Sequence, residues 1–249
     1  MIKHYLKVAF RNLMKYKTQS LVSIIGLAVG FTCFALSALW IRYEMTYDNF
    51  HEGADRIYLV RAHYANEPGT SKFTPYPLMK YLQDKMPEIE AVTAFTAHHV
   101  KFRMEDTEQE IGMIAADSVF MNFFDIQLLK GTVNFLKCDG QEVAITKEFA
   151  KRLFSKEEDA LGKEVEVGRR VCKIGAIVSG WSNHSNIPYN ILAPARHSPR
   201  WGSSNEQLFI RVRERTDIDV FRTKMSTIRI NDIEKESELS DLLQVSLQK

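Results

Sequence analysis

One apolar segment near the N-terminus dominates the hydrophobic pattern of the chain. Residues 18–41 contain no charged side chain, and residues 21–41 are almost all apolar or small. At about 1.5 Å per residue, a helix of this length crosses roughly the ~30 Å hydrocarbon core of a bilayer. We therefore predict one transmembrane helix over residues 21–42.

A cleaved secretory signal is the alternative interpretation of this segment. Its charge-free core is longer than the ~7–15 residues of a typical signal core. Ala35-Leu36-Ser37 also provides only a mediocre small-residue cleavage site. Length therefore favours a retained membrane anchor.

Gly26 and Gly30 lie four residues apart and share one face of the predicted transmembrane helix. Small residues at this spacing let another membrane helix approach closely. Because glycine is common in membrane helices in general, the pair is only a moderate indication of helix packing.

The first 20 residues form an amphipathic pattern. Apolar side chains recur on one side of a helical wheel and polar ones on the other. The basic residues of this segment are Lys3, Lys7, Arg11, Lys15 and Lys17. We predict a cytoplasmic helix that lies on the inner leaflet, with its bases near anionic headgroups. The second interpretation is that these bases dock a cytoplasmic partner.

Charge is distributed unevenly about the apolar segment. The chain has 33 Lys+Arg and 31 Asp+Glu, but residues 1–42 carry a net charge of +6 and the remainder −4. Since basic flanks stay in the cytoplasm, we expect the N-terminus inside the cell and residues 43–249 outside. The balanced total of +2 gives no electrostatic reason to expect nucleic-acid binding.

Beyond residue 43, stretches typical of strands and helices alternate irregularly. Strands are expected at residues 56–64, 89–104, 109–116, 142–145, 165–167, 171–178 and 207–212. Helices are expected from Thr74-Pro75 to Pro87, after Ser118 and Thr146, at 217–236, and in a C-terminal segment at 237–249. Because strict βαβ alternation is lacking, the predicted class is α+β, with one folded domain over residues 43–236.

Motifs of catalysis or cofactor binding are missing from the sequence. It contains no P-loop, no GxGxxG string and no GxSxG nucleophile elbow. His98, His99, His184 and His197 do not have the spacing of metal ligands. We therefore expect a protein that is not an enzyme and has neither a cofactor nor a metal.

The cysteines leave one question open. Three cysteines are too few for a disulfide-dense scaffold. On the predicted topology, Cys138 and Cys172 both face an oxidising compartment. A disulfide between them and two separate thiols are both compatible with their spacing.

The segment directly beyond the membrane helix is dense in charged and aromatic residues. The candidates are Glu44, Tyr47, Asp48, Phe50, His51, Asp55 and Arg56. One interpretation is a solvated juxtamembrane stretch with weak local ion pairs. The other is a mechanical stalk that carries motion between the membrane helix and the domain.

Several short strings, in order, resemble permeases of MacB/FtsX-type ABC transporters, in particular the Bacteroidetes-type members. Near the membrane these strings are Arg11-Asn12-Leu13, Gly26-Leu27, Tyr43-Glu44, Tyr47-Asp48, Phe50-His51 and Ala54-Asp55-Arg56-Ile57-Tyr58. Further along they are Thr74-Pro75-Tyr76-Pro77-Leu78, Ala116-Asp117-Ser118, Leu129-Lys130-Gly131, Glu142-Val143-Ala144-Ile145-Thr146 and Leu161-Gly162-Lys163. The resemblance extends from about residue 3 to about residue 230.

This resemblance implies a bilobed MacB-like periplasmic core domain behind one membrane helix. The porter-like α+β lobe would come from the two flanks, and a strand-rich lobe would be inserted near residues 115–190. Family permeases continue into three more membrane helices, which these 249 residues lack. The chain would then be either a fragment of a longer permease or a complete single-pass protein.

The function implied by the resemblance is transport without catalysis by this chain. It would be a permease-type subunit of the inner membrane, working with an ABC ATPase in trans and with other permease helices or a second copy. Its periplasmic domain would contact a periplasmic adaptor or the cargo. The alternative is a single-pass anchored interaction or sensor protein without transport activity.

Overall fold

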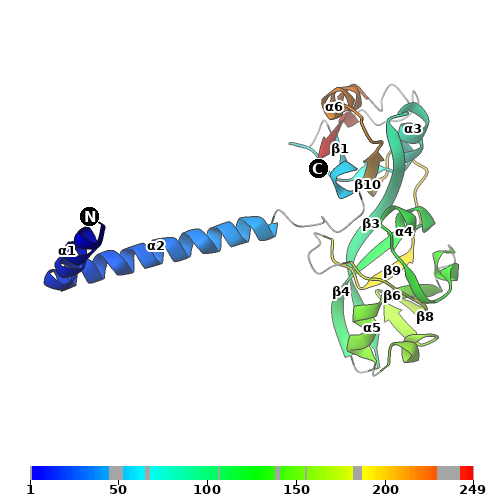
Figure 1. Cartoon of the computed structure of the whole chain (residues 1–249). Coiled ribbons are helices and arrows are strands. Elements are labelled where there is room, and N and C mark those ends of the chain that lie inside the picture. The colour runs from blue at the N-terminus through cyan, green and yellow to red at the C-terminus, as the bar shows by residue number, and fades with distance from the viewer. Residues whose placement is uncertain are drawn as a thin grey trace. The chain divides into compact units, whose positions relative to one another are not determined.

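The computed structural model describes residues 2–44, 53–64, 68–105, 107–137, 141–154, 156–181, 187–228 and 242–248. The chain divides into two units, Met1–Tyr47 and Asp48–Lys249. The first is purely helical, and the second holds all the described strands (Figure 1).

The N-terminal unit consists of α1 (Ile2–Lys15) and α2 (Lys17–Glu44). Helix α2 is long and apolar enough to cross a membrane, and its apolar side chains are exposed on all sides. The hydroxyl of Thr32 donates to the carbonyl of Ala28 at 2.8 Å, so this polar group is satisfied within the helix. The helix exceeds the predicted residues 21–42 at both ends, and Lys17 therefore belongs to α2.

The second unit alternates strands with short helices. In chain order it contains η1 (Ala54–Arg56), β1 (Ile57–Tyr64), β2 (Thr74–Pro75), α3 (Pro77–Lys85), β3 (Ile89–Met104), β4 (Thr107–Ala116), α4 (Ser118–Phe123), β5 (Leu128–Gly131), η2 (Val133–Leu136), β6 (Glu142–Thr146), α5 (Lys147–Leu153), η3 (Glu157–Ala160), β7 (Glu164–Val167), β8 (Arg170–Val178), β9 (Ile191–Pro194), β10 (Ser204–Val212), α6 (Ile218–Ser226) and β11 (Leu242–Gln248). This mixture confirms the α+β class.

Strand β3 joins the two parts of this unit. Its first half pairs antiparallel with β10, from Ile89 to Phe95, and its second half pairs with β4, from Thr96 to Met104. The strand-rich part thus begins near residue 96, in the middle of β3, whereas the sequence suggested about 115. The reason is that every residue from Thr96 to Met104 pairs with β4, so this half of β3 belongs to the same part as β4.

The first lobe contains β11, β1, β10 and the start of β3, paired in that order. Helices α3 and α6 contribute Leu78, Leu82, Phe221 and Met225 to its core. Helix α3 begins at Pro77, two residues later than predicted. The difference arises because Thr74–Pro75 form β2 and pair with β10.

The second lobe is a closed barrel of six strands. Around the ring, β3 pairs with β4, β4 with β9, β9 with β6, β6 with β8, β8 with β7, and β7 again with β3. Each strand of this ring has a neighbour on both sides, and β5 pairs with β8 outside the ring. The aromatic rings of α4, with Phe95 and Trp181, pack against the outside of these strands in a separate core.

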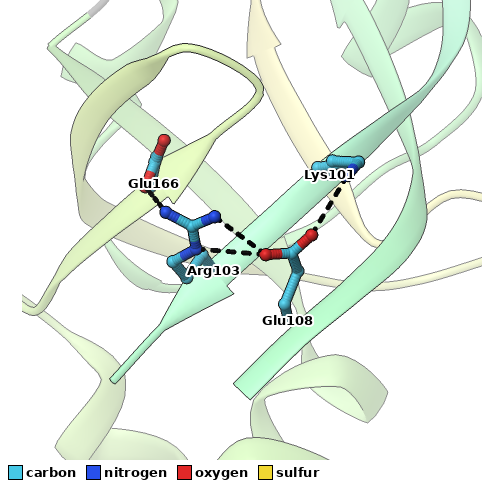
Figure 2. A network of polar contacts seen from close by, with 4 residues as sticks. All are labelled: Lys101, Arg103, Glu108 and Glu166. Atoms are coloured by element: carbon cyan, nitrogen blue, oxygen red, sulfur yellow. Dashed lines mark hydrogen bonds and ion pairs between the residues drawn. The ribbon is translucent and has the colours of Figure 1, made fainter. Parts of the chain in front are cut away.

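The seam between β7 and β3 is narrow, with Phe102 opposite Val167 and Arg103 opposite Glu166. Figure 2 shows that Arg103 reaches carboxylates on both neighbouring strands, at 2.8 Å from Glu108 and 3.2 Å from Glu166. Lys101 also pairs with Glu108 at 3.1 Å. Because these groups are solvent-exposed, each pair adds little stability, but together they bridge three strands at the point of closure.

The helix predicted at residues 237–249 is wrong for the described residues 242–248. They form β11, which pairs antiparallel with β1. Apolar Leu243, Val245 and Leu247 alternate with polar residues, a period of two that favours a strand. The exposed edge of β1 supplies the hydrogen-bonding partners. Of the helix predicted at 217–236, the described part is α6, which ends at Ser226, and residues 229–236 lie outside the described residues.

Candidate functional site at the entry to the folded domain

The structure leaves both glycines of α2 in open surroundings. A methyl group added to Gly26 or Gly30 would meet no atom within 4 Å. The lack of a side chain at both positions would let another helix approach closely. The use of this face as a packing site stays a prediction.

The basic residues of the N-terminus divide between the two helices. Lys3, Lys7, Arg11 and Lys15 lie in α1, and Lys17 lies in the first turn of α2. The described side chains among them, those of Lys7, Arg11, Lys15 and Lys17, are exposed. They are therefore accessible both to lipid headgroups and to a protein partner.

The predicted juxtamembrane residues are only partly described. Glu44 is the last residue of α2, and Asp55 and Arg56 lie in η1. Tyr47, Asp48, Phe50 and His51 lie outside the described residues. The candidate site is therefore built from the point where the chain enters the folded domain.

Gly53 begins this entry with a left-handed backbone, at φ 69°. The amide of Arg56 donates to the carbonyl of Gly53 at 2.9 Å, which closes the tight turn of η1. A Cβ at Gly53 would lie 3.1 Å from the Arg56 guanidinium. Glycine thus permits both the turn and the position of this arginine.

Arg56 ties the entry to two distant strands. Its Nη1 donates to Glu90 Oε2 on β3 at 2.6 Å and to the carbonyl of Val212 on β10 at 3.0 Å. The hydrogen bond from Arg56 to Glu90 raises the pKa of the guanidinium. The first described turn after α2 is thus fastened to the sheet of the first lobe.

A second set of polar contacts lies close by, where β3 begins and β10 ends. Lys224 of α6 donates to both oxygens of Glu88, at 2.7 and 3.0 Å. The hydrogen bond from Lys224 lowers the pKa of the Glu88 carboxyl. The side chain of Arg213 donates to the carbonyl of Pro87 at 2.9 Å. These contacts hold β3, β10 and α6 together beneath the entry.

An open pocket of about 550 Å³ lies at this place. Asp55, Arg56, Arg213, Glu214 and Arg215 contribute charged groups of both signs to its lining. A pocket that is open to solvent and lined by charges of both signs suits contact with a polar protein segment better than enclosure of an apolar ligand. The arrangement offers charged groups of both signs for contact with a polar segment.

Sequence reasoning missed the partners of Arg56, because Glu90 and Val212 lie 34 and 156 residues away. It also missed a buried contact of His197. The Nδ1 atom of His197 lies 3.2 Å from Glu206 Oε1, and the imidazole stacks on Tyr76 with 4.0 Å between ring centroids. No local signal in the sequence relates these three residues.

The remaining candidates are dispersed. His98 and His99 lie exposed on β3, and His184 is outside the described residues. Cys172 is buried on β8, and this burial raises the pKa of its thiol. Because Cys138 also lies outside the described residues, its pairing with Cys172 stays a prediction.

Solved structures share this fold. A domain of a protein described as a permease from Porphyromonas gingivalis is 20% identical, with a TM-score of 0.65, and the match covers 80% of this chain and 91% of that one. The extracellular domain of the noncanonic ABC-type transporter YknZ from Gram-positive bacteria is 14% identical, with a TM-score of 0.55 and coverage of 78% and 100%. The periplasmic region of MacB from Actinobacillus actinomycetemcomitans is 12% identical, with a TM-score of 0.55 and coverage of 78% and 88%.

Family membership follows from a sequence match rather than from these distant structures. No curated protein matches the chain significantly. The family model described as MacB-like periplasmic core domain matches residues 20–228, which is most of the chain. The chain therefore belongs to the MacB-like periplasmic core domain family.

Proposed function

We propose that this chain is a non-catalytic, permease-type component of an ABC transporter. Motion driven by a partner ATPase passes through α2 into the MacB-like domain, which contacts a periplasmic adaptor or the cargo. The observation that carries this proposal is the fastening of the domain entry, where Arg56 bonds both β3 and β10. Force applied to the chain at Gly53 would therefore be transmitted to the sheet through Arg56.

The proposed topology places the N-terminus in the cytoplasm, α2 in the inner membrane and the folded domain in the periplasm. The uneven charge about α2 supports this orientation. A membrane-impermeant maleimide applied to intact spheroplasts tests it. In a C33S/C138S/C172A background, a cysteine replacing exposed Thr107 should react, whereas one replacing Lys7 should react only after lysis. The reverse pattern would refute the orientation.

A single helix cannot form a translocation path, so the proposal requires other membrane helices. The open face at Gly26 and Gly30 is the proposed contact, either with further permease helices or with a second copy. Exposed bases on α1 and at the start of α2 are the proposed contact with the inner leaflet or the ATPase.

Co-purification is the direct test of this function. The full chain, tagged and extracted in mild detergent, should retain an ABC ATPase subunit, and G26L/G30L should lose the membrane partners. I24L/A28L, which alters exposed residues on the opposite face of α2, is the matched control. A stable membrane-bound chain that never retains an ATPase would instead support the single-pass interaction or sensor protein.

A second measurement addresses the coupling itself. In the assembled complex, ATP with vanadate should change amide hydrogen exchange at the start of β1 in the original chain. R56Q should reduce that change while the ATPase still co-purifies, because the link to Glu90 and Val212 is weakened. An unchanged response in R56Q would separate Arg56 from coupling.

A further inference from the structure

The six-stranded barrel of the second lobe has a hollow mouth. Buried Val143, Val167, Cys172 and Ala193 point into its interior core. They also line a pocket of about 340 Å³ whose wall includes the last residues of β7 and β9 and the first of β8. The pocket therefore opens at one end of the barrel, a place where small-molecule sites commonly occur.

The rest of the barrel interior is filled. Ile145, Ile174 and Ile191 are fully buried beyond the pocket. Phe102 and Phe149 of α5 meet edge to face, with 5.1 Å between their ring centroids. The mouth is therefore a blind apolar well and not part of a channel.

The rim of this well is cationic. Arg169, Arg170, Arg196 and His98 line it, and no aspartate or glutamate does among the described residues. The amide of Gly168 donates to the carbonyl of Lys101 at 2.7 Å, which fixes the turn that presents Arg169 and Arg170. In the described parts of the chain these two arginines have no carboxylate partner, whereas Arg56 and Arg103 do.

We propose that the barrel mouth binds a single-chain amphiphile with a carboxylate head, such as a medium-chain fatty acid. The hydrocarbon chain would cover Val143, Val167 and Ala193, and the carboxylate would accept hydrogen bonds from Arg169 and Arg170. Guanidinium groups bind carboxylates with two parallel hydrogen bonds. This binding site is independent of the coupling role and can exist without it.

Size and charge select this ligand class. The pocket is near the lower limit of the roughly 300–1,000 Å³ found for ligand sites, so a single chain suits it better than a diacyl lipid. Neutral amphiphiles would gain no charge-assisted hydrogen bonds from the exposed rim arginines. Cations would be repelled by the same arginines.

Photolabelling of the full chain in phosphatidylcholine nanodiscs tests the proposal. The probe is dodecanoate with a terminal diazirine, and mass spectrometry locates the adducts. Label is expected on peptides containing Met113, Val143, Cys172 or Ala193, in addition to nonspecific label on α2. R169Q/R170Q should lower the barrel label about tenfold, because charge-assisted hydrogen bonds are lost.

Controls make the result decisive. K80Q/K85Q removes the same charge from exposed positions on α3 and should leave the barrel label unchanged. A193F should abolish it by filling the well, with the melting temperature as the check on folding. A diazirine analogue of dodecanol should label the barrel weakly.

Four outcomes would overturn the inference. The first is label confined to α2, and the second is equal barrel label in R169Q/R170Q. The third is equal barrel label by the neutral alcohol. The fourth is barrel label that phosphatidylglycerol in the nanodisc displaces more effectively than unlabelled dodecanoate does. The last outcome would assign the mouth to a diacyl lipid of the membrane surface.

Discussion

Arg56 Nη1 and Glu90 Oε2 lie 2.6 Å apart and connect the first turn of the folded domain to the long strand β3. Their side chains are 25% and 38% exposed, so salt screens the pair in part. The pair therefore contributes little to the free energy of unfolding. It still fixes the position of the turn, because the same guanidinium also donates to the carbonyl of Val212.

The first prediction concerns this link. E90Q should speed tryptic cleavage after Arg56 and amide exchange at the start of β1, while global stability changes little. The reason is that the charge-assisted hydrogen bond becomes a weaker neutral one. E110Q, at an exposed position of β4, is the matched control and should behave like the original chain. Equal cleavage rates in E90Q and E110Q would contradict the role of Glu90.

The second prediction concerns acid stability. Lys224 lowers the pKa of Glu88 below the ordinary value of 4.5 in the folded chain. A carboxyl with a lowered folded pKa stabilises the protein above its unfolded pKa, and this stabilisation is lost as pH falls through the folded pKa. Denaturant unfolding should therefore show E88Q less stable near pH 7, with the difference shrinking below about pH 4.5. A difference that persists unchanged at low pH would exclude Glu88 as the titrating group.

The third prediction compares two glycines with left-handed backbones. Gly131 has φ 85°, and a Cβ there would lie 2.2 Å from the carbonyl oxygen of Gly175. Gly162 has φ 77° and open space around it. G162A should cost about 1 kcal/mol from the backbone alone. G131A should cost clearly more, because β5 must move away from β8. Urea unfolding measures both, and equal losses would show that the contact is relieved cheaply.

The fourth prediction concerns the aromatic core outside the barrel. Phe95 is fully buried and contacts Phe120 and Phe209, with ring centroids 4.9 and 5.5 Å apart. F95A should destabilise the domain by about 3–5 kcal/mol, since it removes apolar contacts and leaves a cavity. Thermal unfolding of F95A and of F73A, at an exposed phenylalanine, tests this. A small effect in F95A would mean that the core collapses into the space.

Local pattern was sufficient for several elements. The charge-free run predicted α2, and the strands predicted at 89–104 and 109–116 form the β3–β4 hairpin. Thr146 was predicted to cap a helix, and its hydroxyl accepts from the amide of Phe149 at 3.3 Å. The short helix after Ala116 has its cap one residue earlier than predicted, at Asp117.

The sequence by itself determined the features that depend on neighbours within about ten residues: the membrane-length helix, its charged flank, the hairpins and the helix caps. Only the tertiary structure decided the rest, because those features need partners far along the chain. Pairing with β1 made a strand of residues 242–248. Arg56 contacts Glu90 because β3 lies next to the start of the domain in the fold. Arg169 lines the same pocket as His98 and Arg196 because β7 pairs with β3. Periodicity within one segment carries no information about which distant segment will hydrogen-bond to its backbone or pair with its charged side chains.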